Sequence, residues 1–420
     1  MSTAVSPSGT RAPAASHTPE AMSRTVPDDR TTTTRRIASI DIIRGAVMVL
    51  MAIDHVRVFS GVPAGGPTPG VFFTRWITHC CAPAFIFLAG TAAFLYGEKA
   101  RDRGTLARFL LARGVWLVLL ELTVLRFGWT FNFDYAHYVL AGVIWVIGWC
   151  MILMSALVYL PVVVVGTIGG AIIALHNVRD SFPLARAASQ STLAWLWQVL
   201  YFGGPISLGG GEDGPQLAVL YSIIPWIGVM AAGFGFGRVM QMEAGRRRHV
   251  CLSLGAGAIV AFLILRGFNL YGDPRPWGNA TPPAPTLLQF LGTTKYPASL
   301  LFLLMTLGPT ILAIPLLERA RGPIANVLTV FGRVPFFYYV LHIPLIHLIF
   351  VCLSLARFGS VIPWMTANHP MFNPPPPSGY TYSLTALYAI TLLAVTILYF
   401  PCRWFAGVKA RRRDRWLGYL

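Results

Sequence analysis

Polar residues that can transfer protons recur inside segments that are otherwise apolar. The stretch MAIDHVRVFSG contains Asp54 and His55, and the stretch FFTRWITHCCAPAFIFLAG contains His79. A third stretch, FYYVLHIPLIH, contains His342 and His347. Histidine is the side chain best suited to proton transfer near neutral pH. Because ionisable groups are costly inside apolar segments that cross a membrane, these residues are candidates for a functional site.

The composition predicts the elements that must position these side chains. Of the 420 residues, 55% are hydrophobic and 12% are charged, whereas a soluble domain carries about 25% charged residues. Long apolar stretches alternate with short polar ones, and a bilayer core is crossed by roughly 20 apolar residues in a helix. Lipid offers no hydrogen-bond partner to the backbone, and the stretches are too long and too uniformly apolar for barrel strands. The sequence therefore predicts an all-α, polytopic transmembrane helical bundle.

We expect about ten spans, each roughly 20 residues long. They lie near 40–60, 74–96, 107–128, 138–158, 160–177, 216–238, 250–269, 296–316, 323–352 and 383–406. The nearly uncharged run 138–177 is too long for one span, and Pro161 offers a break between two. The aromatic segment 192–208 is expected to lie at the membrane interface or to re-enter the membrane.

The basic residues predict the orientation of the bundle. With the N-terminus inside, the inner segments hold 22 Lys and Arg residues and the outer segments hold seven, as the positive-inside rule requires. Both termini are then cytoplasmic in a multi-pass protein. The net charge of +17 reflects this topology, and we expect a lipid bilayer and no nucleic acid as partner. The excess of Arg over Lys is typical of a GC-rich bacterial genome, so we expect the bacterial inner (cytoplasmic) membrane.

The chain divides into one membrane domain and two tails. Residues 1–36, rich in Ser, Thr, Pro and Ala, are expected to form a disordered cytoplasmic tail. The transmembrane domain is expected over 37–407, and a basic cytoplasmic tail over 408–420. The six cysteines lie in or beside apolar segments without a C-x-x-C spacing, which is typical of buried free thiols.

Most of the histidines lie on one predicted side of the membrane. Counted from residue 40, His55 lies about 22 Å along its helix and so in the outer half of the membrane. The second span begins on the outer side, which places His79 in the outer half too, and His342 comes late in the ninth span, which runs outward like the first. A single histidine of this kind is often a hydrogen-bonded interfacial residue. His55 and His79, however, lie several residues inside apolar helices, which favours a functional role.

Two further ionisable sites leave alternatives open. Asp41 and Arg44 share a helix face at the inner edge. They either anchor the helix N-terminus or bind an anionic group such as a phosphate. Glu121 lies midway along the third span. It is either paired with Arg126 or with an arginine of another helix, or it is part of a proton or substrate path. The sequence contains no Walker A loop, no H-E-x-x-H and no G-x-S-x-G, and no metal is expected.

Three segments carry a family resemblance. RIASIDIIRGAVMVLMAIDH (36–55) resembles the opening of the heparan-α-glucosaminide N-acetyltransferase-like membrane proteins, with the pattern S-[IV]-D-x-x-R-G. PAFIFLAGTAAF (83–94) is similar to the family's P-x-F-x-F-x-x-G, and FGRVPFFYYVLHIPLIH (331–347) looks like the late motif of the bacterial branch. The resemblance implies transmembrane acyl transfer. In the family's characterised enzyme, cytosolic acetyl-CoA donates an acetyl group to a terminal glucosamine amine on the far side.

The sequence departs from the family pattern at one place. The family's active-site histidine lies in the loop after the first span, but 61–72 here reads GVPAGGPTPGVF and contains no histidine. His55 stands where the family enzyme has a catalytic asparagine. We therefore expect either a displaced catalytic group or a different chemistry.

Taken with the resemblance, the residues predict an acyltransferase. We expect His55 to be the general base, with His79 or His342 assisting and Asp54 orienting one of them. Arg44 with Asp41 would hold the donor, acetyl-CoA or another acyl-CoA, and the acceptor would be a glycan or lipid-linked sugar.

Two other hypotheses remain open at this point. The first is a transporter of a small anionic or sugar substrate, with Glu121, Arg126 and the histidines forming the path. The second is a b-type haem protein with His55 and His342 as axial ligands. The sequence is also compatible with a homo-oligomer.

Overall fold

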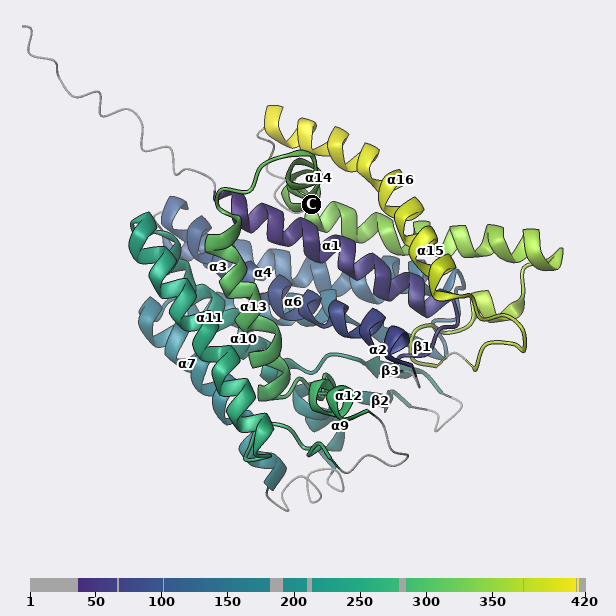
Figure 1. The fold of residues 1–420 in the computed structure, drawn as a ribbon, viewed down its shortest axis with the longest axis horizontal. Helices are drawn as coiled ribbons and strands as arrows, with labels where there is room; N and C mark the ends of the chain where they lie inside the picture. Colours follow the sequence, from purple (N-terminus) through teal and green to yellow (C-terminus); the bar gives the residue numbers. More distant parts are fainter. Residues whose placement is uncertain are drawn as a thin grey trace, which may run out of the picture. The chain divides into compact units, whose positions relative to one another are not determined.

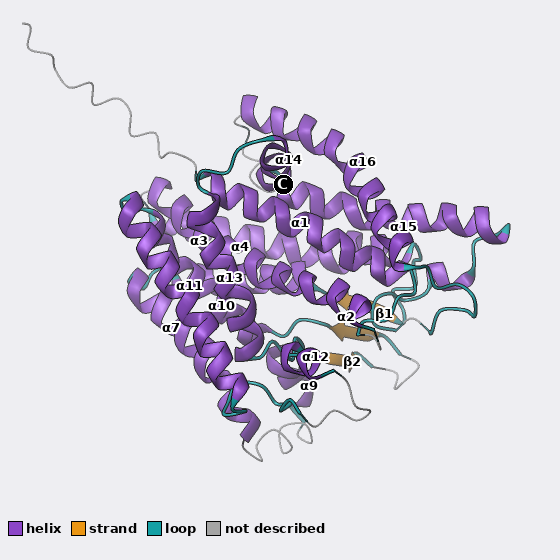
Figure 2. Cartoon of the chain, in the orientation of Figure 1, coloured by secondary structure: helices purple, strands orange, loops and turns teal. Residues whose placement is uncertain are grey.

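The structure is a computed structural model of the chain. It describes residues 37–65, 68–100, 102–181, 192–209, 214–278, 285–372, 374–412 and 414. The predicted tail 1–36 lies outside these residues, as does most of 408–420. The described residues form an all-α fold with one small sheet, as the apolar pattern predicts (Figure 2).

Each predicted span contains a helix. In the first half of the chain the elements are α1 (Ala38–Phe59), α2 (Pro69–Trp76), η1 (Ile77–Cys80), α3 (Cys81–Ala100), α4 (Arg103–Leu120), the π-helical η2 (Glu121–Leu125), α5 (Arg126–Thr130), α6 (Val143–Leu157), α7 (Val162–Leu175) and η3 (His176–Ser181). The second half contains α9 (Ala194–Trp197), η4 (Gln198–Phe202), α10 (Ile223–Met240), α11 (Ala244–Gly267), α12 (Thr286–Leu291), α13 (Leu300–Leu317), α14 (Pro323–Arg333), α15 (Pro335–Phe358), η6 (Pro363–Thr366) and α16 (Leu384–Arg411).

Six helical segments of the described chain are long and apolar enough to cross a membrane. They are Pro69–Ala100, Ile223–Met240, Ala244–Gly267, Leu300–Leu317, Pro335–Phe358 and Leu384–Arg411. In α11 and α16 only 22% of the apolar window is buried within the protein, so their apolar faces are turned outward, where lipid would cover them. The chain is a helical membrane protein. α1 has the length of a span, but it carries Asp41, Arg44, Asp54 and Arg57 among its apolar residues.

The predicted ninth span, 323–352, is two helices rather than one. α14 ends at Arg333 and α15 begins at Pro335. A proline has no N–H to donate and its ring clashes with a preceding helical turn, so it starts a helix more readily than it continues one. α15 alone, at 24 residues, has the length of a span.

Three short strands were not expected from the sequence. β1 (Tyr138–Ala141) and β3 (Gln216–Val219) pair in parallel, and β2 (Gly204–Ser207) pairs with β3 in the antiparallel sense. β1 and β3 occupy the starts of the predicted spans 138–158 and 216–238, so the helices there begin later than expected. β2, with α9 and η4, forms the aromatic segment 192–208.

α1 lies at the centre of the elements that position the site. It contacts α3, α13, α14, α15 and α16, and Figure 1 shows it beside α14 and α15. Two glycines allow α1 and α14 to touch through their backbones. A Cβ on Gly45 would lie 1.9 Å from the Leu328 carbonyl oxygen, and one on Gly332 would lie 1.8 Å from the Asp41 carbonyl oxygen. The glycine of the S-x-D-x-x-R-G pattern is therefore a packing residue.

The cysteines are free, as predicted, but they are not all buried. Cys81, Cys150, Cys251 and Cys402 are buried, whereas Cys80 is partly exposed and Cys352 is exposed. Cys352 lies on α15.

Candidate functional site

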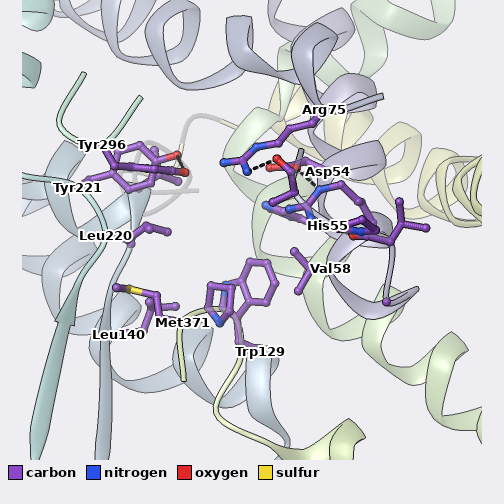
Figure 3. A pocket seen from close by; sticks show the side chains of 18 of the residues that line it. Asp54, His55, Val58, Arg75, Trp129, Leu140, Leu220, Tyr221, Tyr296 and Met371 are labelled. Atoms are coloured by element: carbon purple, nitrogen blue, oxygen red, sulfur yellow. Dashed lines mark hydrogen bonds and ion pairs between the residues drawn. The ribbon is translucent and has the colours of Figure 1, made fainter. Parts of the chain in front are cut away.

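A cavity of about 350 Å³ opens beside the C-terminal half of α1. Figure 3 shows Asp54 and His55 on one side of it, across from Tyr221 and Tyr296, with Trp129 between them. Other residues of the lining come from α2, η2, β1 and α15 and from the loops that follow α1, β3, α12 and η6. The cavity is thus built from parts of the chain that are far apart in sequence, and α1 supplies its ionisable wall.

Two of the predicted histidines meet at this cavity. The Nδ1 atom of His55 lies 2.6 Å from the Nε2 atom of His342, and the two rings meet edge to edge, with centroids 4.7 Å apart and planes 23° from parallel. His342 is fully buried on α15, and its own Nδ1 lies 2.6 Å from the Tyr339 carbonyl oxygen. The structure therefore brings together the residues predicted on the first and ninth spans.

The hydrogen-bond chain fixes the positions of the protons. A carbonyl oxygen can only accept, so His342 must donate from Nδ1 to Tyr339. With both rings neutral, the Nε2 atom of His342 then accepts from Nδ1–H of His55. The Nε2 atom of His55 keeps its lone pair and has no hydrogen-bond partner among the residues the structure describes. This nitrogen, in a side chain that lines the cavity, is ready to accept a proton.

Asp54 is held by an arginine rather than by a histidine. Its Oδ1 accepts from Nε of Arg57 at 3.0 Å, and Arg57 also donates to the Val62 carbonyl oxygen at 3.2 Å. The i, i+3 spacing on α1 makes this ion pair. Asp54 remains a neighbouring negative charge for His55, but the ring of His55 is oriented by His342.

Glu121 reaches the same cavity and does not pair with Arg126. Its Oε2 accepts from the Ile144 N–H at 2.9 Å, at the start of α6. Its Oε1 is buried and has no partner among the described residues. A Cβ on Gly142 would lie 2.5 Å from Oε1, so a glycine is needed there for the carboxyl group to approach.

The predicted Glu121–Arg126 ion pair is therefore wrong. Arg126 instead donates to the carbonyl oxygens of Tyr138 at 3.0 Å and Asp134 at 2.7 Å. It also donates to the Asn132 carbonyl oxygen and to the Thr130 hydroxyl. A guanidinium group has five donors, and the end of α5 and the following turn present carbonyl groups that need them.

The other predicted site residues lie elsewhere. His79, in η1, lines a neighbouring cavity together with Arg75 and Lys295. Asp41 and Arg44 lie at the other end of α1, where Arg44 donates to the Leu88 carbonyl oxygen at 2.9 Å. Neither Asp41 nor Arg44 belongs to the lining of the two cavities.

Three more histidines are bonded to backbone carbonyl groups. His347 lies 2.8 Å from the Met365 carbonyl oxygen, His176 lies 2.8 Å from that of Ala298, and His369 lies 2.9 Å from that of Trp364. Burial lowers the pKa of His369, in the loop after η6, to about 4. These residues fit the structural interpretation of an interfacial histidine.

Several residues of the lining were not singled out from the sequence. Tyr221 and Tyr296 face each other, and the Tyr296 hydroxyl donates to that of Tyr221 at 3.5 Å. Burial, followed by the neighbouring Tyr296, raises the pKa of Tyr221 well above its ordinary value, so its hydroxyl stays protonated. Arg75 and Lys295 are two of the seven basic residues that the sequence places in the outer segments. One signal was present in the sequence, since Lys295 is one of only three lysines in the chain.

The geometry of His55 and His342 does not fit axial haem ligation. Their facing nitrogens are 2.6 Å apart, whereas a metal ion between two imidazoles requires about 4 Å, at about 2 Å for each metal–nitrogen bond.

A comparison with models of protein families finds a match. The family described as heparan-alpha-glucosaminide N-acetyltransferase, catalytic, matches residues 36–269, more than half of the chain. A search of curated proteins found no match. The matched range contains α1 with His55 and the whole of η1 with His79, while His342 lies beyond it.

Proposed function

The chain belongs to the heparan-α-glucosaminide N-acetyltransferase catalytic family, and from this premise we propose that it transfers an acyl group across a membrane. The donor is acetyl-CoA or another acyl-CoA on the cytoplasmic side. The acceptor is an amine or hydroxyl group of a sugar, glycan or lipid-linked sugar on the outer side. The N-terminus of α1 is cytoplasmic in this proposal, which places the His55 cavity on the outer side.

The observation that supports this proposal most directly is the pair of histidines. His342 holds His55 through a 2.6 Å contact and leaves Nε2 of His55 unbonded among the described residues. Acyl transfer to an amine or hydroxyl needs a base near neutral pH at the acceptor, and a positioned histidine meets that need. His55 is then the catalytic residue and His342 a positioning residue.

The reaction step follows from this geometry. Nε2 of His55 takes the proton from the acceptor as its nitrogen or oxygen bonds to the thioester carbonyl carbon. The carbon–sulfur bond of the donor breaks, and the leaving thiolate takes the proton from His55 to give free coenzyme A. The ring of His55 returns to its starting state, and charge and atoms balance without a metal.

Two neighbouring residues, His342 and Asp54, assist the protonated ring of His55. His342 accepts from Nδ1–H of His55 in both protonation states, which holds the ring in one orientation. The negative charge of Asp54 favours the positive charge that forms on His55. Because Arg57 holds Asp54 at 3.0 Å, Asp54 acts through its field rather than by a hydrogen bond to the ring.

The donor would enter from the other end of α1. From Arg44 to His55 the distance along the helix is about 16 Å, at 1.5 Å per residue. We assign Arg44, with Asp41, to the phosphate end of the donor, because a guanidinium group suits phosphate recognition. The pantetheine arm of coenzyme A would span the remaining distance to the cavity.

The acceptor would be held by the polar groups on the opposite wall. Tyr221, Tyr296 and Glu121 all belong to the lining of this cavity, and the buried Oε1 of Glu121 has no hydrogen-bond partner among the described residues. Hydroxyl and carboxyl groups of this kind recognise the hydroxyl groups of a sugar. The volume of about 350 Å³ lies in the usual range of small-molecule sites.

The proposal is tested with the purified full chain in detergent. Radiolabelled acetyl-CoA is incubated with a panel of amino sugars and glycans, using the native protein and His55→Ala. His137→Ala is the matched control, because the His137 side chain is 62% exposed. We expect transfer by the native protein and the control, and a loss of about a hundredfold or more in His55→Ala.

Two outcomes would contradict the proposal. One is full transfer by a folded His55→Ala variant, which would remove His55 as the base. The other is a native protein that neither binds coenzyme A nor transfers acetyl to any acceptor, while a control acetyltransferase is active on the same panel. Counterflow of an anionic or sugar substrate in proteoliposomes would then identify the chain as a transporter built on the family's fold.

A further inference from the structure

A second cavity adjoins the one that contains His55. Its volume is about 630 Å³, and it is lined by the segment after α1, by α2 and η1, and by the loops that flank α12. The two cavities share Ala64, Arg75 and Tyr296 in their linings. The two cavities therefore share a wall, and a molecule in the second lies next to the first.

The lining of the second cavity carries an excess of positive charge. Arg75, Arg275 and Lys295 all belong to it, and it contains no carboxylate. The nearby Asp273 accepts four hydrogen bonds, one of them from the Arg275 N–H at 3.0 Å. It accepts from the Thr294 N–H at 2.7 Å and the Thr294 hydroxyl at 2.9 Å, and from the Ser299 hydroxyl at 2.8 Å.

Of these three cations, Lys295 has the most unusual surroundings. The residue is only 8% exposed, and among the described residues its ammonium group has neither a hydrogen bond nor an ion pair. Its Nζ lies 5.2 Å from the centroid of the adjacent Tyr296 ring. The charge of Asp54, in the adjoining cavity, interacts with that of Lys295, but Asp54 is already bonded to Arg57. Lysine is almost never fully buried unless its charge is paired, so an ammonium group beside an open cavity leaves room for a further anionic partner.

Further unused polar atoms surround the same cavity. Nε of Arg75, the hydroxyl of Thr293 and Nδ1 of His79 are buried without a partner among the described residues. A buried donor that is left unbonded destabilises the protein, and more so when it is charged. A water molecule could satisfy Thr293, but water does not neutralise three cations. A ligand with several acceptor oxygens and negative charge would meet all of these requirements.

We propose that this second cavity, the Lys295 cavity, binds a phosphate-type oxyanion. A tetrahedral anion presents several acceptor oxygens and up to two negative charges, which matches a mixed set of ammonium, guanidinium and hydroxyl donors. The anion is carried either by a soluble molecule such as a sugar phosphate or by the headgroup of a lipid. The chemistry at the cavity is the same in both cases.

The shared wall suggests how such an anion would be used. An acceptor with its anionic group at Lys295 would extend past Arg75 and Tyr296 and place its amine or hydroxyl group near His55. This use rests on the proposed acyl transfer, whereas binding of the anion does not.

The test measures anion binding directly. Isothermal titration of the full chain in neutral detergent, with inorganic phosphate and with glucose 6-phosphate, compares the native protein with Lys295→Gln. Lys295→Arg keeps the charge, and Arg248→Gln removes an exposed charge from the opposite end of α11. We expect saturable binding that is about tenfold weaker or worse in Lys295→Gln and is kept in the other two variants.

A lipid arm separates the two sources of the anion. Protein reconstituted with phosphatidylglycerol is examined by native mass spectrometry for lipid that remains bound. Retention that depends on Lys295, without binding of the soluble phosphates, supports the proposal with a headgroup as ligand. Binding of no anion in either arm, or equal binding by the native protein and a monodisperse Lys295→Gln, overturns it.

The two proposals fail separately. A native protein that acetylates a neutral amino sugar but binds no phosphate would refute only the anion site. A native protein that binds phosphate through Lys295 but transfers no acyl group would refute only the acyltransferase.

Discussion

The two ends of α1 carry similar residues in different surroundings. Each end has an aspartate and an arginine three residues apart, Asp41 with Arg44 and Asp54 with Arg57. At the first end Gly45 and Gly332 bring the backbones of α1 and α14 into contact. At the second end α1 lines an open cavity. The same pair of residue types thus lies where α1 packs tightly against α14 at one end of the helix, and beside an open cavity at the other. We call these the packed end and the open end of α1.

This difference shows where chemistry can occur. A general base must be within reach of its substrate, and among the predicted site residues on α1 only Asp54 and His55 line a cavity. We assign donor binding to the packed end of α1 because the guanidinium group of Arg44 suits phosphate. We assign the reaction to the open end because Nε2 of His55 is unbonded there. Four predictions test this division of roles.

The largest expected effect comes from disrupting the backbone contact between α1 and α14 at the packed end. Gly45→Val places a side chain where the Leu328 carbonyl oxygen lies 1.9 Å from the Cβ position, so α1 and α14 must separate. Overpacking of this kind costs about 3 kcal/mol or more when backbone must move. We expect little folded protein by fluorescence-detected size exclusion and a strongly lowered thermal midpoint.

Gly170→Val is the matched control for this variant. A Cβ on Gly170, in α7, would meet nothing within 4 Å, so we expect normal yield. Equal thermal midpoints for the two variants would show that the α1–α14 contact is not tight.

The next effect concerns the open end. His342→Ala removes the acceptor that orients His55 but leaves the base in place. We expect kcat to fall about tenfold to a hundredfold with KM for the acceptor nearly unchanged, a smaller loss than for removal of the base itself. His342→Gln, whose side-chain oxygen can still accept from His55, should recover part of the rate. A wild-type kcat in His342→Ala would show that the histidine pair does not set the reactive nitrogen.

A smaller effect is expected from the donor assignment. Arg44→Gln keeps a donor for the Leu88 carbonyl oxygen, which Arg44 contacts at 2.9 Å, but removes the charge. We expect KM for acyl-CoA to rise several-fold with kcat little changed, as loss of uniform binding requires. Steady-state kinetics with acyl-CoA as the varied substrate measures this. An unchanged KM would show that Asp41 and Arg44 anchor the N-terminus of α1 and do not bind the donor.

The smallest effect concerns the loop that covers the open end. His369 is buried and bonded to the carbonyl oxygen of Trp364, a residue of the cavity lining. Its pKa is lowered to about 4 by burial, against about 6.5 in an unfolded chain. The unfolded state then binds more protons between these values, so stability present above pH 6.5 is lost as the pH falls toward 4.

His369→Gln should remove this contribution. We expect the thermal midpoint of the native protein to fall by a few degrees between pH 6.5 and 4, and a flatter dependence in the variant. The native and variant midpoints are compared in the same buffers by differential scanning fluorimetry. Parallel curves would show that His369 does not titrate in this range.

Much of the fold followed from the apolar pattern, because lipid permits few alternatives for long apolar segments. The helices were found in each predicted span, and His55 and His342 were predicted at similar depth. The short strands β1, β2 and β3 were not expected, since strands of four residues have too few residues to show an alternating pattern. The division of the predicted ninth span into α14 and α15 coincides with Pro335, a residue type that favours the start of a helix.

The site was harder to predict than the helices. That His55 and His342 touch depends on the rotation of α1 against α15, which hydropathy does not determine. The Glu121–Arg126 pairing was inferred from proximity in sequence, yet each group found backbone partners instead. The second cavity depends on loops that flank α12, whose sequence alone shows only a few scattered cations.

The most direct test of the central claim is chemical rescue of the base. Imidazole is added to purified His55→Ala during acetyl transfer, since truncation leaves space beside a cavity of about 350 Å³. If His55 acts as the base, imidazole should restore part of the lost rate in a saturable manner, and His137→Ala should not respond. A folded His55→Ala variant that is inactive at every imidazole concentration, or one that is fully active without imidazole, would contradict the account.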